Sequence, residues 1–377
     1  MTDHYYIHIP FCRQRCPYCK FALTPVFDEF KQRRYIEYLK KEIREYFVPV
    51  ITKNDQVQVS KNTEHRLLRA SQWLKQETIY FGGWTPSVLS HSEVREILEC
   101  FPFYGESGIE ITMEMNPEDV TPEYISWVLA LGINRISLGI QTLNETSLKE
   151  IHRSDRNTIL SALSSIWSWI KQSESNISLN IDFILGLPFV KPWETLAGIQ
   201  ELHTRFPLIT HTSVYMLEDE SYPKHWRENS ITADDMQTEF LAIMDYFESI
   251  WWHHYELSNF AKPAYESAHN QAYWDHSETR GFGMSAASYE WGMRWSNSSS
   301  FTGYYGSKRH NTETLTPEQI EMEKMMFGLR RDGWNYDKKL KKLDTLINDW
   351  LIEVTENRIK PTKTWIFVID HILSELI

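Results

Sequence analysis

The stretch IPFCRQRCPYCKF, from Ile9 to Phe21, holds three of the four cysteines in this chain of 377 residues. Four cysteines are too few for a disulfide framework in a chain of this length. Closely spaced thiols in a reducing compartment are more often metal ligands or redox groups. The stretch therefore predicts a metal or iron–sulfur centre, and the neighbouring sequence shows which fold carries it.

The cysteine spacing, CxxxCxxC, offers three ligands, Cys12, Cys16 and Cys19. Structural zinc generally takes four Cys or His ligands. The fourth cysteine, Cys100, lies in a predicted helix and has no CxxC partner. A 4Fe–4S cluster with one iron left unbound by protein agrees with three ligands better than a structural zinc ion does. Three incidental buried cysteines are the remaining alternative.

Short strands alternate with helices over about the first 220 residues. Strand patterns occur at residues 5–10, 77–83, 110–115, 135–141, 177–187 and 213–217. Helical patterns occur at residues 30–47, 92–101, 122–131, 144–172 and 193–205. This order predicts βα units around a parallel sheet, and thus an α/β fold.

Polar or glycine residues follow these strands repeatedly. The positions are Cys12, Gly83, Asn116, Gln141 and Gly186. In barrel-like α/β folds the carboxyl ends of the strands carry the chemistry. We therefore expect the cysteine loop and these strand ends to form one site.

The rest of the chain is less regular. Residues 51–75 are polar and predict a surface insertion, and residues 236–310 are aromatic and suggest a loop-rich connecting region. Residues 311–377 predict a small C-terminal α/β domain, with helices and a strand near residues 364–369. The expected division is a core domain at 1–235, the connecting region, and the C-terminal domain.

The net charge, the apolar runs and the first residues of the chain predict its class of partner and its cellular location. The net charge is −12 and the pI about 5.6, which argues against a general nucleic-acid binder because phosphate contacts need Lys and Arg. No apolar run is long enough for a transmembrane helix. The start, MTDHYYIHIP, lacks the features of a signal peptide. We expect a cytoplasmic protein.

A CxxxCxxC loop with an aromatic residue before the last cysteine, after the first strand of an α/β chain, resembles the radical SAM superfamily. The resemblance implies a partial (β/α)6 TIM-like barrel in which three thiolates hold a 4Fe–4S cluster. S-adenosylmethionine (SAM) would chelate the fourth iron and be cleaved reductively to a 5′-deoxyadenosyl radical. An electron donor for the cluster is then also implied. The cofactors would carry the difficult chemistry.

Further stretches resemble one branch of that superfamily, which holds the anaerobic coproporphyrinogen oxidases and the HemW family of heme chaperones. These stretches are YIHIPFC, FGGWTPS, EITMEMNPE, NRISLGIQTLNE and NIDFILGLP. Carried over by position, the resemblance implies SAM contacts from Tyr6, Tyr18, Gly83, Thr85, Glu114, Gln141, Arg153 and Asp182. The residue types are suitable, since carboxylates accept from an ammonium group or ribose hydroxyls and an arginine can pair with a carboxylate.

Two features favour the chaperone side of this branch. The oxidases have a further cysteine two positions after the third, where this chain has Phe21, and a long N-terminal extension, whereas the first strand here begins near residue 5. The stretch HNQAYW at 269–274 matches the HNxxYW motif linked to heme binding. The resemblance thus implies heme contacts from His269, Tyr273 and Trp274, with spare candidates at His253, His254 and His276.

The sequence departs from the family pattern at three places. Trp84 replaces the third glycine of GGGTPS, Lys20 follows the third cysteine where aspartate is common, and Ala287 replaces a histidine in GFGMSAAS. The bulky Trp84 side chain must point away from SAM, because otherwise it would narrow the SAM pocket and lower the affinity for SAM.

Two functions are compatible with this sequence. One is a heme chaperone that binds the cluster, SAM and heme and delivers heme to an acceptor hemoprotein. The other is an enzyme, an oxygen-independent coproporphyrinogen III oxidase of porphyrin biosynthesis, acting on a porphyrinogen. A purely structural zinc protein is hard to reconcile with GGWTPS, EMNPE and NIDFILGLP.

Overall fold

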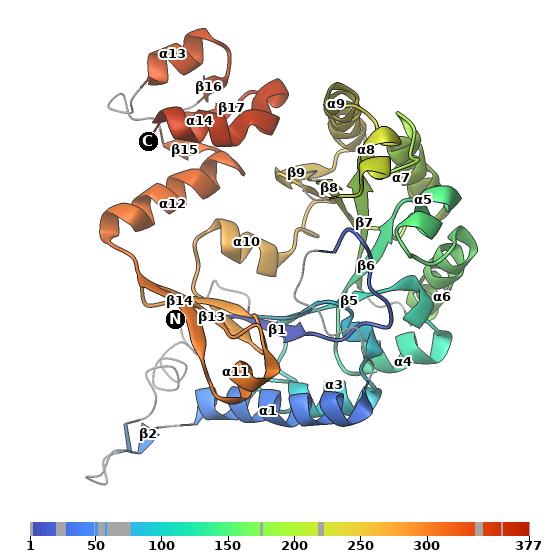
Figure 1. The fold of residues 1–377 in the computed structure, drawn as a ribbon, viewed down its shortest axis with the longest axis vertical. Helices are drawn as coiled ribbons and strands as arrows, with labels where there is room; N and C mark the ends of the chain where they lie inside the picture. Colours follow the sequence, from blue (N-terminus) through green and yellow to red (C-terminus); the bar gives the residue numbers. More distant parts are fainter. Residues whose placement is uncertain are drawn as a thin grey trace. The chain divides into compact units, whose positions relative to one another are not determined.

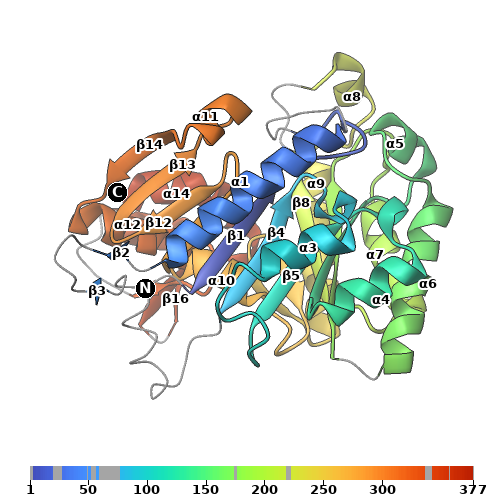
Figure 2. The same ribbon diagram turned by 90° about the horizontal axis from the view of Figure 1, so that it is seen from below.

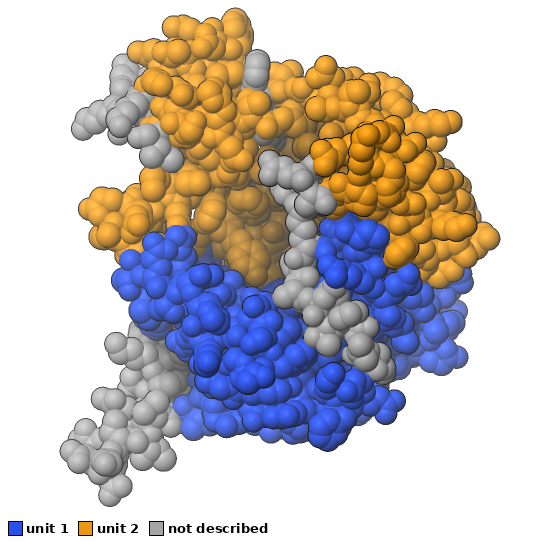
Figure 3. All heavy atoms as spheres, in the orientation of Figure 1, with its two compact units in different colours: residues 1–137, 161–177, 277–314 blue, residues 138–160, 178–276, 315–377 orange. Residues whose placement is uncertain are grey.

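The structure is a computed structural model. It describes residues 3–19, 28–48, 50–51, 57–58, 77–173, 176–217, 222–335, 342–355 and 357–376. The chain divides into two compact units (Figure 3). Unit 1 comprises residues 1–137, 161–177 and 277–314, and unit 2 comprises residues 138–160, 178–276 and 315–377. Within the described ranges, no helix has both the length and the apolar character that crossing a membrane requires.

The strands of unit 1 are hydrogen-bonded in the order β14-β13-β12-β11-β1-β4-β5. Their bounds are β1 (His4–Ile9), β4 (Thr78–Gly83), β5 (Glu110–Met115), β11 (Thr279–Phe282), β12 (Ala287–Glu290), β13 (Met293–Asn297) and β14 (Arg309–Thr314). The four strands β11, β1, β4 and β5 run parallel, and antiparallel pairing adds β12 to β14. Ile9 pairs with Gly83, so β1 and β4 end at the same edge.

Helices α1 (Glu29–Phe47) and α3 (His91–Leu98) lie side by side on one face of these strands (Figures 1 and 2). Helix α1 begins where the Asp28 carboxylate accepts from the backbone amides of Phe30 and Lys31. Its apolar stripe is buried against the sheet. The other short elements of unit 1 are η1 (Pro86–Val88), η2 (Pro117–Asp119), α4 (Pro122–Ala130), α11 (Phe301–Tyr305), and a small hairpin of β2 (Val50–Ile51) and β3 (Val57–Gln58).

Unit 2 contains a second group of paired strands. Strand β7 (Ser178–Leu185) runs parallel to β8 (His211–Met216), and β10 (Asn259–Ala261) and β9 (His253–Glu256) extend the sheet antiparallel. Its helices are α5 (Glu145–Glu150), α7 (Glu194–Arg205), α8 (Lys224–Glu228), α9 (Ala233–Ser249) and α10 (Ala268–Trp274). Strand β6 (Arg135–Gln141) and helix α6 (Arg156–Ser173) each have residues in both units.

The C-terminal part of unit 2 has its own core of buried apolar side chains. Its elements are α12 (Pro317–Leu329), β15 (Trp334–Asn335), α13 (Leu343–Asn348), β16 (Ile352–Thr355), β17 (Arg358–Pro361), η3 (Lys363–Val368) and α14 (Ile369–Leu376). Fully buried Ile359 and Ile372 lie in this core. The predicted strand at 364–369 is wrong: the segment forms η3, because it leads directly into α14, whose buried residues recur at helical spacing.

The predicted alternation of strands and helices up to residue 217 is confirmed, with limits shifted by a few residues. The predicted helix 92–101 ends early, at Leu98. The description of residues 236–310 as loop-rich is wrong, since they contain most of α9, strands β9 to β13 and helices α10 and α11. Those strands have three to five residues, too few to show an apolar alternation. The predicted domain limits stay a prediction, and most of the insertion at 51–75 lies outside the described residues.

Candidate functional site

The cysteine loop begins directly after β1. Cys12, Cys16 and Cys19 are all free thiols, and Cys12 and Cys16 are buried. The backbone amide of Cys19 donates to the carbonyl of Cys16 over 3.0 Å. The Thr85 hydroxyl, at the end of β4, donates to the Cys12 sulfur over 3.0 Å. The structure therefore joins two predicted site residues, Cys12 and Thr85, that are 73 positions apart in the chain.

The three thiols have the chemistry that an iron–sulfur cluster requires, because thiolates are its usual ligands. They are reduced, they lie within eight positions of one another, and one already accepts a hydrogen bond. The described residues nevertheless contain no group of three or more His, Cys, Asp or Glu side chains arranged as a metal site. The donor set fits the cluster, and the ligand assignment stays a prediction.

The cysteine loop is attached to the next strand end by an ion pair. The Arg13 guanidinium donates to Asp119 over 2.7 Å, and the Ser87 hydroxyl donates to the other oxygen of the same carboxylate over 2.7 Å. Burial raises the pKa of Asp119, and the hydrogen bonds from Ser87 and Arg13 oppose that effect. Sequence reasoning did not single out Asp119. The only signal was its place beside the strand end Glu110–Met115.

Three of the predicted SAM residues, Tyr6, Gly83 and Glu114, lie around the end of β4. The Glu114 carboxylate accepts from the Gly83 amide over 3.1 Å and from the Tyr80 hydroxyl over 2.7 Å. Tyr6 stacks on Tyr80 with ring centroids 6.0 Å apart. A Cβ at the preceding Gly82 would lie 2.7 Å from the Tyr80 ring and 2.8 Å from the Tyr6 ring. The first glycine is therefore required by packing.

The second glycine of this turn, Gly83, has a φ of +113°. Side chains rarely adopt that conformation, and a Cβ there would lie 2.8 Å from the His8 ring. Tyr18, the remaining predicted SAM residue of unit 1, is half-buried between Cys16 and Cys19.

Two buried nitrogen atoms near these strand ends have no hydrogen-bond partner within the described residues. They are Nε2 of His8 on β1 and Nε1 of Trp84, directly after β4. Burial lowers the pKa of His8 to about 4, so its imidazole is neutral, and its Nδ1 lies 3.1 Å from the Tyr6 hydroxyl. An unpaired buried polar atom is costly unless a ligand or water completes it. These atoms are consistent with a polar cofactor such as SAM.

The other predicted SAM residues, Gln141, Arg153 and Asp182, belong to unit 2. Gln141 ends β6 with a φ of +71°, a left-handed conformation that is strained for a residue with a side chain. The Arg153 guanidinium donates to the carbonyl of Gly139 on the same strand. Asp182, on β7, accepts from the Asn180 side chain over 2.8 Å. Arg153 therefore contacts the same strand, β6, that Gln141 ends.

The HNQAYW motif forms helix α10. Ser267 caps it by accepting from the Asn270 amide. His269 is buried, and its Nε2 lies 3.0 Å from the Tyr273 hydroxyl, with the two rings perpendicular. The Tyr273 side chain is exposed, and Trp274 is half-buried. The motif therefore presents a tyrosine ring at the surface and holds it with a buried histidine.

The spare histidines have other partners within unit 2. His253 lies 2.7 Å from Glu266, and His276 lies 2.8 Å from Glu323 on α12. Burial lowers the pKa of His254 to about 4, and its ring stacks on Phe260.

A buried carboxylate lies next to the HNQAYW helix. Burial raises the pKa of Glu256, on β9, to about 7, although the Ser258 amide and the side chains of Asn259 and Asn270 donate to it. Its folded pKa thus exceeds the ordinary value of 4.5, so the folded state binds the proton more tightly. The stability that this gives is complete below pH 4.5 and is lost as the pH rises through about 7.

Glu256→Gln is expected to remove this pH dependence, because the amide stays neutral. At pH 8 the free energy of unfolding of the variant should exceed that of the parent protein by about 1–3 kcal/mol, and near pH 4.5 the two should be similar. Denaturant unfolding at both pH values measures this. Glu248→Gln, on an exposed carboxylate of α9, is the control. A deficit of the Glu256 variant at pH 8 would show that the carboxylate is ionised and needed there.

Comparison with known proteins gives matches to a family model, to relatives in sequence and to solved structures. The family model described as the radical SAM superfamily matches residues 6–197. The heme chaperone HemW of Lactococcus lactis subsp. lactis strain IL1403 is 31% identical over 339 residues, covering 86% of this chain and 81% of that protein. The heme chaperone HemW of Bacillus subtilis strain 168 is 29% identical over 346 residues, covering 86% of this chain and 83% of that protein.

A solved structure also matches this chain. The coproporphyrinogen III oxidase (HemN) of Escherichia coli, described as a radical SAM enzyme, superposes with a TM-score of 0.76. The alignment covers 99% of this chain and 89% of that one, at 19% identity. Identity this low shows the fold alone, and the expected α/β fold with a partial barrel is confirmed by it.

Proposed function

The chain belongs to the radical SAM superfamily and, within it, to the HemW family, and from this premise we propose that it binds heme and delivers it to an acceptor protein. A 4Fe–4S cluster and SAM are the cofactors of the superfamily and therefore of this chain. The observation that carries the proposal is the relationship to heme chaperones over 86% of the chain. The exposed tyrosine of the HNQAYW helix supports it.

Within this proposal, Cys12, Cys16 and Cys19 hold the cluster. The residues assigned to SAM are Tyr6, Tyr18, Gly83, Thr85, Glu114, Gln141, Arg153 and Asp182. When bound, the cluster supplies electron transfer to SAM. The chain itself supplies the thiols, of which those of Cys12 and Cys16 are buried, and carboxylates for the ammonium group and ribose hydroxyls.

Heme binds at α10 in this proposal, through His269, Tyr273 and Trp274. A tyrosine or tryptophan ring can pack on the macrocycle, and a histidine nitrogen can ligate its iron. Because Tyr273 occupies Nε2 of His269, ligation through that nitrogen requires the tyrosine to turn away. The implied partners are an electron donor for the cluster and an acceptor hemoprotein, in the cytoplasm.

One preparation, reconstituted anaerobically with iron and sulfide, tests the function. Titration with heme should give a saturable complex with a Soret band. Incubation with coproporphyrinogen, SAM and a reductant should give no protoporphyrinogen. Formation of protoporphyrinogen, or absence of a heme complex, would contradict the proposal; the first result would favour the oxidase instead.

His269→Ala is expected to weaken heme binding about tenfold or more. The substitution removes a candidate ligand and also frees the Tyr273 ring that it holds. The dissociation constant from heme titration measures this. His310→Ala is the matched control, because that histidine is exposed on β14 and is neither in the motif nor among the spare candidates. Equal affinity of the His269 variant and the parent protein would leave the motif without a role in heme binding.

A further inference from the structure

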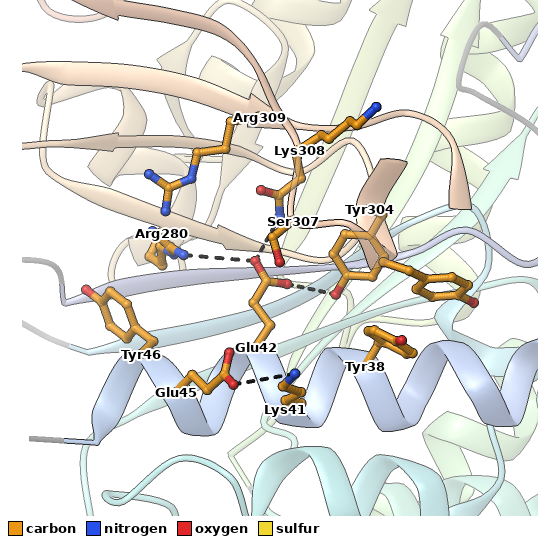
Figure 4. A pocket seen from close by; sticks show the side chains of 12 residues that line it. Tyr38, Lys41, Glu42, Glu45, Tyr46, Arg280, Tyr304, Ser307, Lys308 and Arg309 are labelled. Atoms are coloured by element: carbon orange, nitrogen blue, oxygen red, sulfur yellow. Dashed lines mark hydrogen bonds and ion pairs between the residues drawn. The ribbon is translucent and has the colours of Figure 1, made fainter. Parts of the chain in front are cut away.

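A pocket of about 410 Å³ lies within unit 1, between helix α1 and strands β11, β13 and β14 (Figure 4). Tyr38, Lys41 and Tyr46 line it from α1, and Arg280 and Arg309 line it from β11 and β14. Its volume is in the range of small-molecule sites. It shares no residue with the sites assigned above to the cluster, SAM or heme.

The lining of this pocket is basic although the chain as a whole is acidic. Of the twelve lining residues, four are cationic, namely Lys41, Arg280, Lys308 and Arg309, and two are acidic, Glu42 and Glu45. The net charge of the chain is −12. A concentration of positive charge in a hollow attracts anions, because low-dielectric walls focus the field.

The acidic residues of the pocket have donors of their own. Glu42 accepts from the amide of Gly283 over 2.9 Å, from the Asn297 side chain over 2.9 Å and from the Tyr304 hydroxyl over 2.7 Å. Glu45 lies 3.7 Å from Lys41. These carboxylates are therefore held by neighbours other than Arg309, which forms no ion pair within the described residues.

The two guanidinium groups of the pocket lie against one indole ring. Arg309 lies 4.5 Å and Arg280 5.2 Å from the centroid of Trp295. Figure 4 shows the Arg309 guanidinium on the side of the pocket where Arg280 and Tyr46 lie. Burial and the neighbouring positive charge of Arg280 lower the pKa of Arg309, and the carboxylates of Glu290 and Glu42 oppose this effect only in part. An anion between the two groups would relieve this repulsion.

Arg280 also has an unused donor. Arg280 is 7% exposed, and its Nε has no hydrogen-bond partner in the described part of the chain. One of its terminal nitrogens lies 3.4 Å from Glu290, and the other lies 3.9 Å from Glu42. A buried arginine with a free Nε beside a second, unpaired arginine is a geometry suited to an oxyanion, which accepts bidentate hydrogen bonds from guanidinium groups.

We propose that this pocket binds a phosphate monoester that carries an aromatic ring. A phosphate monoester is nearly doubly charged and offers three acceptor oxygens, whereas a carboxylate has one charge and two oxygens. Ser307 and Arg309 provide a hydroxyl and a guanidinium for it, whereas Figure 4 shows the Lys308 ammonium directed away from Arg309. The ring of Tyr38 lines the pocket from α1, away from Arg309, and lies 4.3 Å from the Tyr305 ring, so these two rings offer a surface for an aromatic group.

Phenyl phosphate is the probe, titrated into the full chain without heme by isothermal calorimetry. Saturable binding is expected, with Arg309→Gln weakening it about tenfold or more and Arg309→Lys less so, because lysine keeps the charge but not the fork. Arg309 is exposed enough for both variants to fold. Arg294→Gln, on the same hairpin but paired with Glu313 outside the pocket, should change nothing.

Two further probes separate the parts of the ligand. Inorganic phosphate should compete with phenyl phosphate, and benzoate should bind more weakly than phenyl phosphate. The proposal is overturned if phenyl phosphate does not bind saturably, if Arg309→Gln leaves its affinity unchanged, or if phosphate does not compete. Benzoate binding as tightly as phenyl phosphate would overturn the assignment to a phosphate. None of these readouts depends on heme binding, so the two proposals fail separately.

Discussion

Cys16→Ser is expected to abolish assembly of the 4Fe–4S cluster. The loop offers only three thiols, and a serine hydroxyl is a poor substitute for a thiolate ligand of iron. After anaerobic reconstitution, the variant should retain less than about a tenth of the iron and acid-labile sulfide of the parent protein and lose its visible cluster absorption. Iron analysis and Mössbauer spectroscopy on the same samples measure this.

The matched control is Cys100→Ser. Cys100 is also buried, but its thiol donates to the Glu96 carbonyl over 3.2 Å, after helix α3. Burial raises its pKa, which disfavours the thiolate that ligates iron. This variant should keep the full iron content. Zinc in place of iron, or an unchanged cluster in the Cys16 variant, would contradict the ligand assignment and with it the SAM site.

The strands of the sheet could be predicted from sequence because each is a continuous apolar run ended by a turn residue. Strands β5 and β6 begin and end where the sequence pattern placed them. Strand β11 could not be found in this way, since it has four residues and its register comes from β1, more than 270 positions earlier. The other strands of residues 236–310 pair mostly with neighbours in sequence, but each has only three to five residues, too few to show an apolar alternation.

The candidate site shows the same division. The cysteine spacing is enough to predict the ligands, because thiols act through their chemistry and not through their neighbours. Asp119 and His8 could not be predicted from the sequence. Asp119 is important because it pairs with Arg13 in the folded chain. His8 is important because its own Nε2 is buried without a hydrogen-bond partner among the described residues. The basic pocket of unit 1 was equally invisible, because its cations come from segments more than 200 positions apart.

Glu114→Gln is expected to weaken SAM binding about 10- to 100-fold while leaving the iron content unchanged. A carboxylate that accepts from an ammonium group makes a charge-assisted hydrogen bond, and loss of its charge costs about 1.5–3 kcal/mol. The amide oxygen can keep the hydrogen bond from the Gly83 amide, and the new amide NH2 can donate to the Tyr80 hydroxyl oxygen, so the end of β4 should stay in place. Equilibrium dialysis of SAM against the anaerobically reconstituted protein measures the affinity.

Glu118→Gln is the matched control, because Glu118 is exposed on η2, four positions along the same segment. It should bind SAM as the parent protein does. If Glu114→Gln lowers the melting temperature but leaves SAM affinity unchanged, the carboxylate only fixes the Gly83 turn. Equal losses of affinity in both variants would instead indicate a general effect of negative charge near the strand ends. Only a selective loss at Glu114, with iron retained, shows that this carboxylate contacts the cofactor.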